Sequence, residues 1–182
     1  KEIPFNSMIE LGCGPFTNAK LIESIVPTVN DITLLDPLAN TYITSQPNCT
    51  YKDRKLNNKD VMVIASPIEE FKVERTYDLV VMINVLEHCL SIPKIFENIE
   101  QMMEEGSYFV YADVQFDYET IERISKSKYN AGHPLRPTKE YIIDFLSKNF
   151  ETVFSTTFPE VVAGEQAEEL YFIGIKKGLS NE

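Results

Sequence analysis

One stretch decides the fold of this chain: Met8-Ile9-Glu10-Leu11-Gly12-Cys13-Gly14-Pro15-Phe16-Thr17. It begins as a short apolar run that is typical of a buried strand, passes through two closely spaced glycines and ends where a helix is expected to start. Glycine adopts positive φ angles and has no side chain, so Gly12 and Gly14 let the backbone turn sharply and leave room for a ligand. The first N–H groups of the helix point into that turn. A strand of this kind usually places a nucleotide at the carboxyl end of a parallel sheet.

The glycine spacing distinguishes two classes of nucleotide site. A dinucleotide-binding turn of the G-x-G-x-x-G type needs a third glycine at the position of Thr17, so that match fails. The run Glu-Leu-Gly-Cys-Gly-Pro instead resembles motif I of the class I S-adenosylmethionine-dependent methyltransferases. The fuller motif of that family has a third glycine where this chain has Phe16. The resemblance implies a cofactor-binding segment that is made of Glu10, Leu11, Gly12, Cys13 and Gly14, and the alternative is a turn that only needs positive φ.

Length and charge limit the class of protein. A chain of 182 residues, 43% of them hydrophobic, suits one globular domain over residues 1–182. It has no apolar run of membrane-spanning length and no signal-peptide layout at its start. The net charge of −11 disfavours a non-specific grip on nucleic acid and fits poorly with an anionic membrane surface. We therefore expect neither partner.

The cysteines and the chain start give two further expectations. Cys13, Cys49 and Cys89 have no metal-binding or disulfide spacing, so we expect buried thiols, a reducing compartment and a cytoplasmic location, with no metal site. The segment 1–6 is too short for an element, whereas the methyltransferase family usually has a helix ahead of its first strand. We expect that the chain starts late or lacks an upstream helical segment; its oligomeric state stays open.

A helix over 17–26 and a strand over 31–36 follow the glycine turn. Ala19, Leu21, Ile22 and Ile25 have the spacing of a buried helix face. The strand ends in Asp36, which lies 22 residues after Gly14. An acid at this distance, at the tip of the second strand, is where a ribose is held, because a carboxylate accepts from two adjacent hydroxyls. The alternative is a helix cap with Pro37 as the first helical residue, and both roles can hold at once.

The third strand is expected over 61–65, and 38–59 is read as a short helix over 39–45 followed by polar turns. In the resembled family the next segment commonly reads Gly-Asp-Ala-Glu-Asp-Leu, and its Asp meets the adenine. Matching Glu69-Glu70-Phe71 to the end of that motif puts Pro67 at the Asp position, so the acidic contact is lost. The Ile68 N–H and side chain can still contact the ring, which makes Pro67, Ile68 and Glu69 expected cofactor neighbours. The alternative is a plain loop.

The fourth strand, over 76–84, runs into Val85-Leu86-Glu87-His88, which resembles the Val-Leu-Glu-His segment of the same family. The resemblance implies that Asn84, Val85 and His88 lie beside the methionine part of the cofactor. His88 is interpreted as structural rather than catalytic, because the family carries it regardless of acceptor. A helix over 92–105 follows, with its buried stripe at Ile95, Phe96, Ile99, Met102 and Met103.

The last third of the chain is expected to hold the acceptor side. It reads as a strand over 107–113, a helix over 118–128, an ordered loop over 130–137, a helix capped by Thr138, and strands over 151–157 and 169–176 joined by a loop. Family members that act on small molecules often direct a His-containing loop at the acceptor, so His133 is the candidate catalytic base or orienting group. Arg136 binds an anionic substrate or lies in solvent.

Together these motifs predict an α/β fold, a Rossmann-like three-layer sandwich whose seven-stranded, mostly parallel sheet has an antiparallel last strand. The implied activity is transfer of a methyl group from S-adenosylmethionine to a small-molecule acceptor, with S-adenosylhomocysteine as product. Two alternatives remain: a non-catalytic relative that binds the cofactor as a regulatory subunit, and a nicotinamide-dependent oxidoreductase. The sequence does not identify the acceptor.

Overall fold

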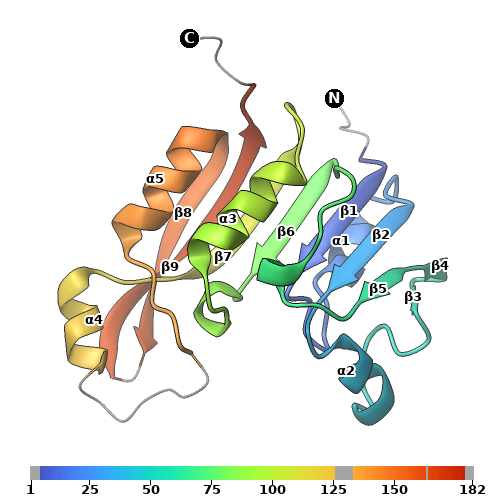
Figure 1. The fold of residues 1–182 in the computed structure, drawn as a ribbon, viewed down its shortest axis with the longest axis horizontal. Helices are drawn as coiled ribbons and strands as arrows, with labels where there is room; N and C mark the ends of the chain where they lie inside the picture. Colours follow the sequence, from blue (N-terminus) through green and yellow to red (C-terminus); the bar gives the residue numbers. More distant parts are fainter. Residues whose placement is uncertain (1–4, 126–132, 163, 179–182) are drawn as a thin grey trace.

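The computed structural model describes residues 5–125, 133–162 and 164–178, and within them a seven-stranded sheet runs in the order β5-β2-β1-β6-β7-β9-β8 (Figure 1). Its strands are β1 (Ser7–Leu11), β2 (Asp31–Leu35), β5 (Met62–Ile64), β6 (Leu79–Ile83), β7 (Tyr108–Gln115), β8 (Phe150–Val162) and β9 (Glu165–Lys176). The helices are α1 (Ala19–Ile25), α2 (Ala39–Ser45), α3 (Ile92–Gln101), α4 (Tyr118–Ser125) and α5 (Lys139–Asn149), with 3₁₀ turns η1 (Ile68–Glu70) and η2 (Leu86–His88). A separate small hairpin pairs β3 (Lys55–Leu56) with β4 (Lys59–Asp60).

The strand directions confirm the predicted architecture. The strands β5, β2, β1, β6 and β7 pair in parallel, and β9 is antiparallel to both β7 and β8. The chain moves outward from β1 to β5 and then returns to place β6 on the other side of β1. Such a reversal of strand order opens a crevice at the carboxyl ends of the two central strands, which is where ligands bind in open α/β sheets.

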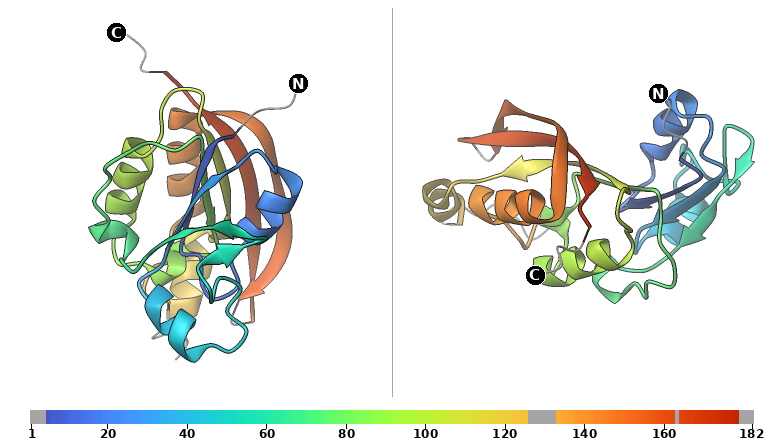
Figure 2. Two further views of the ribbon diagram at one scale, coloured as in Figure 1. Left: turned by 90° about the vertical axis from the view of Figure 1, so that its right-hand side faces the viewer. Right: turned by 90° about the horizontal axis from the view of Figure 1, so that it is seen from above.

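Each central strand, β1, β2 and β6, is buried on both faces, as is usual in a parallel sheet. Ile9, Leu11, Val80 and Met82 face a core that α3 and α5 cover, whereas alternate residues such as Met8 face a second core on the α1 side. Figure 2 shows α1 on the side of the sheet opposite to α3 and α5. Among the described helices, none combines the length and apolar character that a membrane crossing requires.

Helix α1 differs from its prediction. Leu21 and Ile25 are exposed by 64% and 70%, and the buried positions are Ala19 and Glu23. The reason is the β3–β4 hairpin, which sequence analysis read only as polar turns. Its Lys59 forms an ion pair with Glu23 at 3.0 Å, so a charged side chain takes the inner face of a seven-residue helix. Residues two positions away from Ala19 and Glu23 therefore face outward.

The final hairpin is longer than predicted. The segment 159–168, expected as a connecting loop, is mostly paired: Pro159 lies opposite Glu168, and Val162 lies opposite Glu165. Pro159 is tolerated because β8 is an edge strand, where a missing N–H leaves no neighbouring strand unpaired.

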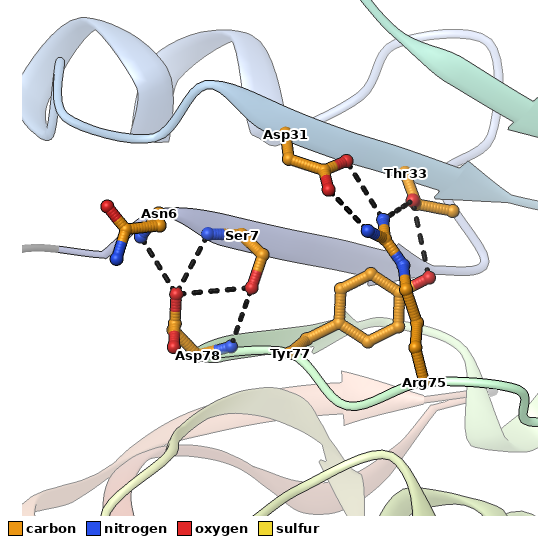
Figure 3. Close-up of polar contacts among 7 residues, drawn as sticks. All are labelled: Asn6, Ser7, Asp31, Thr33, Arg75, Tyr77 and Asp78. Carbon is orange, nitrogen blue, oxygen red and sulfur yellow. Dashed lines mark hydrogen bonds and ion pairs between the residues drawn. The ribbon is translucent and has the colours of Figure 1, made fainter.

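The amino-terminal ends of three strands are joined by polar contacts (Figure 3). The Asp78 carboxylate accepts from the N–H groups of Asn6 and Ser7, at 2.8 and 2.9 Å, while the Ser7 hydroxyl accepts from the Asp78 N–H. Beside it, Arg75 forms a two-pronged ion pair with Asp31 and stacks over the Tyr77 ring. These contacts set the stagger of β1, β2 and β6 at the edge opposite to the crevice.

Candidate functional site

A cavity of about 580 Å³ opens at the carboxyl ends of β1, β2 and β6. Its lining includes most of the residues that the sequence marked as cofactor-binding: Gly12, Gly14, Asp36, Pro37, Pro67, Ile68, Glu69, Asn84, Val85 and His88. Leu38, Tyr42, Cys89 and Leu90 complete the lining and were not singled out by sequence analysis. Four segments that are distant in sequence therefore meet at one cavity.

The glycine turn and the tip of β2 are in direct contact. Asp36 accepts a hydrogen bond from the Gly14 N–H at 3.0 Å through Oδ2, and another from the Leu38 N–H at 2.8 Å through Oδ1. The bond to Leu38 lies in the turn before α2, whose N-cap is Leu38 and whose first residue is Ala39, so the alternative of a helix cap with Pro37 as the first helical residue is wrong. Asp36 also lines the cavity. A carboxylate offers about four acceptor positions, so these two bonds leave capacity for ligand hydroxyls.

Both glycines are required by the geometry of the turn. Gly12 has φ +67°, and a Cβ placed on it would lie 2.6 Å from a Val85 methyl group. Gly14 has φ +54°, and a Cβ there would meet nothing within 4 Å. Gly12 thus allows close packing against the tip of β6, whereas Gly14 leaves open space on the cavity wall.

A buried tyrosine supports the turn from behind. The Tyr51 hydroxyl donates to the Gly14 carbonyl at 2.8 Å, and the neighbouring Thr50 N–H donates to the Pro15 carbonyl at 2.9 Å. Burial raises the pKa of the Tyr51 hydroxyl, so it remains a donor at neutral pH. Sequence analysis missed this support because Tyr51 lies in a polar segment without a periodic pattern.

Three residues of motif I do not line the cavity. Leu11 and Cys13 are buried in the cores, and burial raises the pKa of the Cys13 thiol. Glu10 is 1% exposed and accepts from the N–H groups of Asn18 and Ala19, at 3.0 and 2.9 Å, and from the Thr17 hydroxyl. The hydrogen-bond donors that Glu10 reaches are therefore those at the start of α1, and Glu10 does not line the cavity.

The 3₁₀ turn η1 forms another wall. Pro67 precedes it, and the Ile68 side chain, 2% exposed, packs into the core while the residue also lines the cavity. Glu69 accepts from the N–H groups of Leu90 and Ser91, at 2.6 and 3.2 Å, which ties η1 to the start of α3. Glu69 is thus engaged in positioning the wall.

Asp113 positions the tip of β6, and sequence analysis missed that role. It is 1% exposed, and its Oδ2 accepts from the N–H groups of Val85 and Leu86, at 2.9 and 2.8 Å. Burial raises the pKa of Asp113, although these hydrogen bonds oppose the shift. The contacts hold the chain just after Asn84, which has φ +57°. Asp113 was predicted only as the last residue of a strand, so its spacing carried no signal of this contact.

His133 lies next to the cavity but is not part of its lining. Its ring is 4.4 Å from the ring of His88, which does line the cavity, and the Leu135 N–H donates to the Glu87 carbonyl at 3.4 Å. Burial first, and then the charges of His88 and Arg136, lower the pKa of His133, so its ring is neutral at pH 7. The part of the predicted loop over 130–132 lies outside the described residues.

The cavity suits a group that has adjacent hydroxyls and an apolar ring. Asp36 is a charged hydrogen-bond acceptor on the cavity wall, and the absence of a side chain at Gly14 leaves the space beside it open. Ile68 forms an apolar part of the wall and has a backbone N–H at the start of η1. An adenosine moiety has these features, so the residues that are present fit the cofactor implied by motif I.

Comparisons with known proteins agree with this geometry. A family model described as a methyltransferase domain matches residues 2–148. A comparison with curated proteins gave no match.

Solved structures share the fold. The N-methyltransferase NodS of Bradyrhizobium japonicum WM9, in complex with S-adenosylhomocysteine, is 20% identical, and the match covers 93% of this chain and 78% of that chain with a TM-score of 0.63. The 1,6-didemethyltoxoflavin-N1-methyltransferase of Burkholderia thailandensis, with 1,6-didemethyltoxoflavin and S-adenosylhomocysteine bound, is 17% identical. That match covers 96% of this chain and 72% of that chain with a TM-score of 0.64. A candidate methyltransferase of Bacillus halodurans C-125 is 10% identical, and that match covers 97% of this chain and 94% of that chain with a TM-score of 0.71. At these identities the likeness establishes the fold.

Proposed function

This chain belongs to the methyltransferase domain family of S-adenosylmethionine-dependent enzymes, and from that premise we propose that it methylates a small-molecule acceptor. The cofactor occupies the 580 Å³ cavity, with its ribose hydroxyls on Asp36. The observation that carries the proposal is the hydrogen bond between the Gly14 N–H and the Asp36 carboxylate, because it brings the glycine turn and the acid at the tip of β2 to one wall of a cavity.

In this proposal the other residues at the cavity bind the cofactor. Ile68 packs against the adenine ring, while Pro67, in place of the family's acidic residue, offers no charge to the adenine amine. Asn84, Val85 and His88 line the end of the cavity at the tip of β6, where the methionine part lies. Gly12 and Gly14 allow the backbone of the turn to come close to the cofactor. Behind the turn, Glu10 accepts a hydrogen bond from the start of α1, and the side chains of Leu11 and Cys13 are buried in the cores. Pro37 and Glu69 complete the walls.

The bound cofactor supplies an activated methyl group on a sulfonium. The protein therefore needs chiefly to align the acceptor, and alignment can contribute up to about 7–11 kcal/mol to lowering a barrier. A hydroxyl acceptor also has to lose a proton. His133, held in contact with His88 and kept neutral by its surroundings, is the group proposed to take or orient that proton.

One comparison structure supports a small-molecule acceptor. The 1,6-didemethyltoxoflavin-N1-methyltransferase of Burkholderia thailandensis has 1,6-didemethyltoxoflavin bound, in a fold that this chain shares at a TM-score of 0.64. The net charge of −11 adds that a polyanionic acceptor such as nucleic acid is disfavoured.

The test is a turnover assay with S-adenosylmethionine labelled in its methyl group. We expect label to pass into the small-molecule fraction of a mixed metabolite extract and not into protein or nucleic acid. His133→Asn should lower the rate at least tenfold and leave binding of S-adenosylhomocysteine unchanged, because its ring lies outside the cavity lining.

Other outcomes favour the alternatives. Binding of S-adenosylhomocysteine without transfer to any pool would indicate a non-catalytic relative, and the exposed Phe16 in place of a motif glycine is the feature that would explain it. Binding of NAD without S-adenosylhomocysteine would indicate an oxidoreductase.

A further inference from the structure

A second cavity, of about 480 Å³, lies beyond the end of β7, where α5 begins and the β8–β9 hairpin passes. It is lined chiefly by Gln115, Asp117, Lys139, Thr157, Pro159 and Glu168. None of these residues lines the first cavity. Gln115 and Glu168 are cross-strand partners, as are Glu168 and Pro159, so three adjacent strands present these residues on one face of the sheet.

Gln115 has an unused hydrogen-bond acceptor at this cavity. The residue is 2% exposed, and its Nε2 faces the Glu168 Oε2 at 3.5 Å. Its Oε1 is buried and accepts no hydrogen bond from the described residues. A buried acceptor without a donor costs free energy, so such groups call for an explanation, and a ligand that donates a hydrogen bond is one.

The charged groups around Gln115 favour a cation. Lys139 Nζ lies 2.6 Å from Glu168 Oε2, so these two charges offset one another. Asp117 adds a second carboxylate, whose Oδ1 accepts from the Thr120 N–H at 2.6 Å. That hydrogen bond lowers the pKa of Asp117, which is therefore ionised at neutral pH. The lining thus has one negative charge in excess.

An anionic ligand fits this arrangement poorly. It would bring further acceptors to a buried acceptor and to two carboxylates, whereas the single cation, Lys139, is already engaged with Glu168. The matching chemistry is a positively charged group that has several N–H donors.

We propose that this second cavity binds a small molecule carrying a protonated amine, which donates to Gln115 Oε1 and is attracted by the carboxylates of Glu168 and Asp117. The site is separate from the methyl-transfer cavity and does not depend on the function proposed for that cavity. Gln115 sets the specificity for a donor, and the two acids set the preference for positive charge.

The experiment is calorimetric titration of the full chain with 1,4-diaminobutane. Two matched probes accompany it: 1,4-butanediol, which has donors but no charge, and succinate, which has the opposite charge. We expect saturable binding of the diamine and at least tenfold weaker binding of the other two. Gln115→Leu should weaken diamine binding at least tenfold, whereas Gln101→Leu, on the exposed side of α3, should leave it unchanged.

A second variant keeps the test decisive if Gln115→Leu does not fold. Glu168→Gln retains the size of the side chain and removes its charge, and it should also weaken diamine binding. Thermal unfolding and binding of S-adenosylhomocysteine report whether each variant is folded. The proposal is overturned if the wild-type chain gives no heat with the diamine, if the diol binds equally well, or if folded Gln115→Leu and Glu168→Gln bind the diamine as the wild type does.

Discussion

Gly14 and Asp36 form the smallest unit of the proposed cofactor site. The Gly14 N–H is directed at the Asp36 carboxylate, its positive φ favours glycine, and the space beside its Cα is open. A side chain at this position would therefore act in two ways: it would strain the backbone, and it would project into the space left for the ligand. The two effects can be separated, because Gly106 has the same backbone property at a distance from the cavity.

We predict that Gly14→Ala and Gly106→Ala lower the free energy of unfolding by similar amounts, about 1–2 kcal/mol, because both positions have positive φ and open surroundings. Only Gly14→Ala should also weaken binding of S-adenosylhomocysteine. Urea unfolding and calorimetry of the two variants measure these quantities. Equal ligand affinity in both variants would show that Gly14 has no role in binding.

Individual residues of the site were predicted best where the site needs a positive φ angle or a carboxylate. Gly12, Gly14 and Asp36 were placed at one site from spacing and motif alone, and the structure brings them together. Tyr51 and Asp113 were missed as supports, because each acts through a contact between segments that are distant in sequence. Such contacts leave no periodic signal in the chain.

At the scale of elements, the two ends of the central strands have different tasks. The carboxyl ends carry the cavity, whereas the amino ends carry the contacts of Asp78 with Asn6 and Ser7 (Figure 3). Those contacts join β6 to the start of β1, so they contribute to stability without touching the ligand.

Asp78→Ala should therefore lower the free energy of unfolding by about 1–3 kcal/mol, because the N–H groups of Asn6 and Ser7 lose a charged acceptor. Affinity for S-adenosylhomocysteine should be unchanged. Asp53→Ala, at an exposed position, is the control and should alter neither quantity by more than about 0.5 kcal/mol. A loss of affinity in Asp78→Ala would contradict the separation of the two strand ends.

Asp113, through which β7 holds the chain after β6, makes the free energy of unfolding depend on pH. Burial raises the pKa of Asp113 in the folded chain, so the unfolded chain releases this proton first, at about pH 3.9. The contribution of Asp113 to stability is thus fully present below about pH 3.9 and is lost as the pH rises through its higher folded pKa.

We predict that Asp113→Asn removes this component. Across the range upward from about pH 4, the stability of the wild type relative to Asp113→Asn should fall as the pH rises, in urea unfolding at a series of pH values. A constant difference, or one that grows with pH, would contradict the raised pKa.

Elements were predicted well where burial on both faces determines the sequence, and less well at surfaces. The central strands lie close to their expected ranges, whereas α3 begins at Ile92 as expected but ends at Gln101, four residues before the expected end. The predicted stripe is buried, although Met102 and Met103 follow the helix. On α1, Leu21 and Ile25 were wrongly predicted to be buried, because Glu23, which pairs with Lys59 of an unpredicted hairpin, takes part of the inner face. The β8–β9 hairpin was predicted too short because exposed strand residues on β8 lack an apolar pattern.

At the scale of the whole molecule, the order of the strands explains where both cavities lie. The reversal between β1 and β6 opens the first cavity, and β7 carries the second, beyond Asp113, at Gln115. The seven-stranded, mostly parallel sheet with an antiparallel last strand was expected from the resemblance that the motifs carry, and the structure has it. The second cavity was not predicted, because it depends on Gln115 and Glu168 meeting across β7 and β9.

The central claim is that this sheet holds an adenosine-type cofactor through Asp36, and calorimetric titration with S-adenosylhomocysteine tests it most directly. We predict saturable binding to the wild type, no binding of NAD, and at least a tenfold loss of S-adenosylhomocysteine affinity in Asp36→Ala, because hydrogen bonds to a charged group contribute about 1.5–3 kcal/mol. Asp78→Ala, which removes a carboxylate from the opposite edge of the sheet, should bind as the wild type does. An absence of binding to the wild type, or equal affinity in Asp36→Ala, would contradict the account.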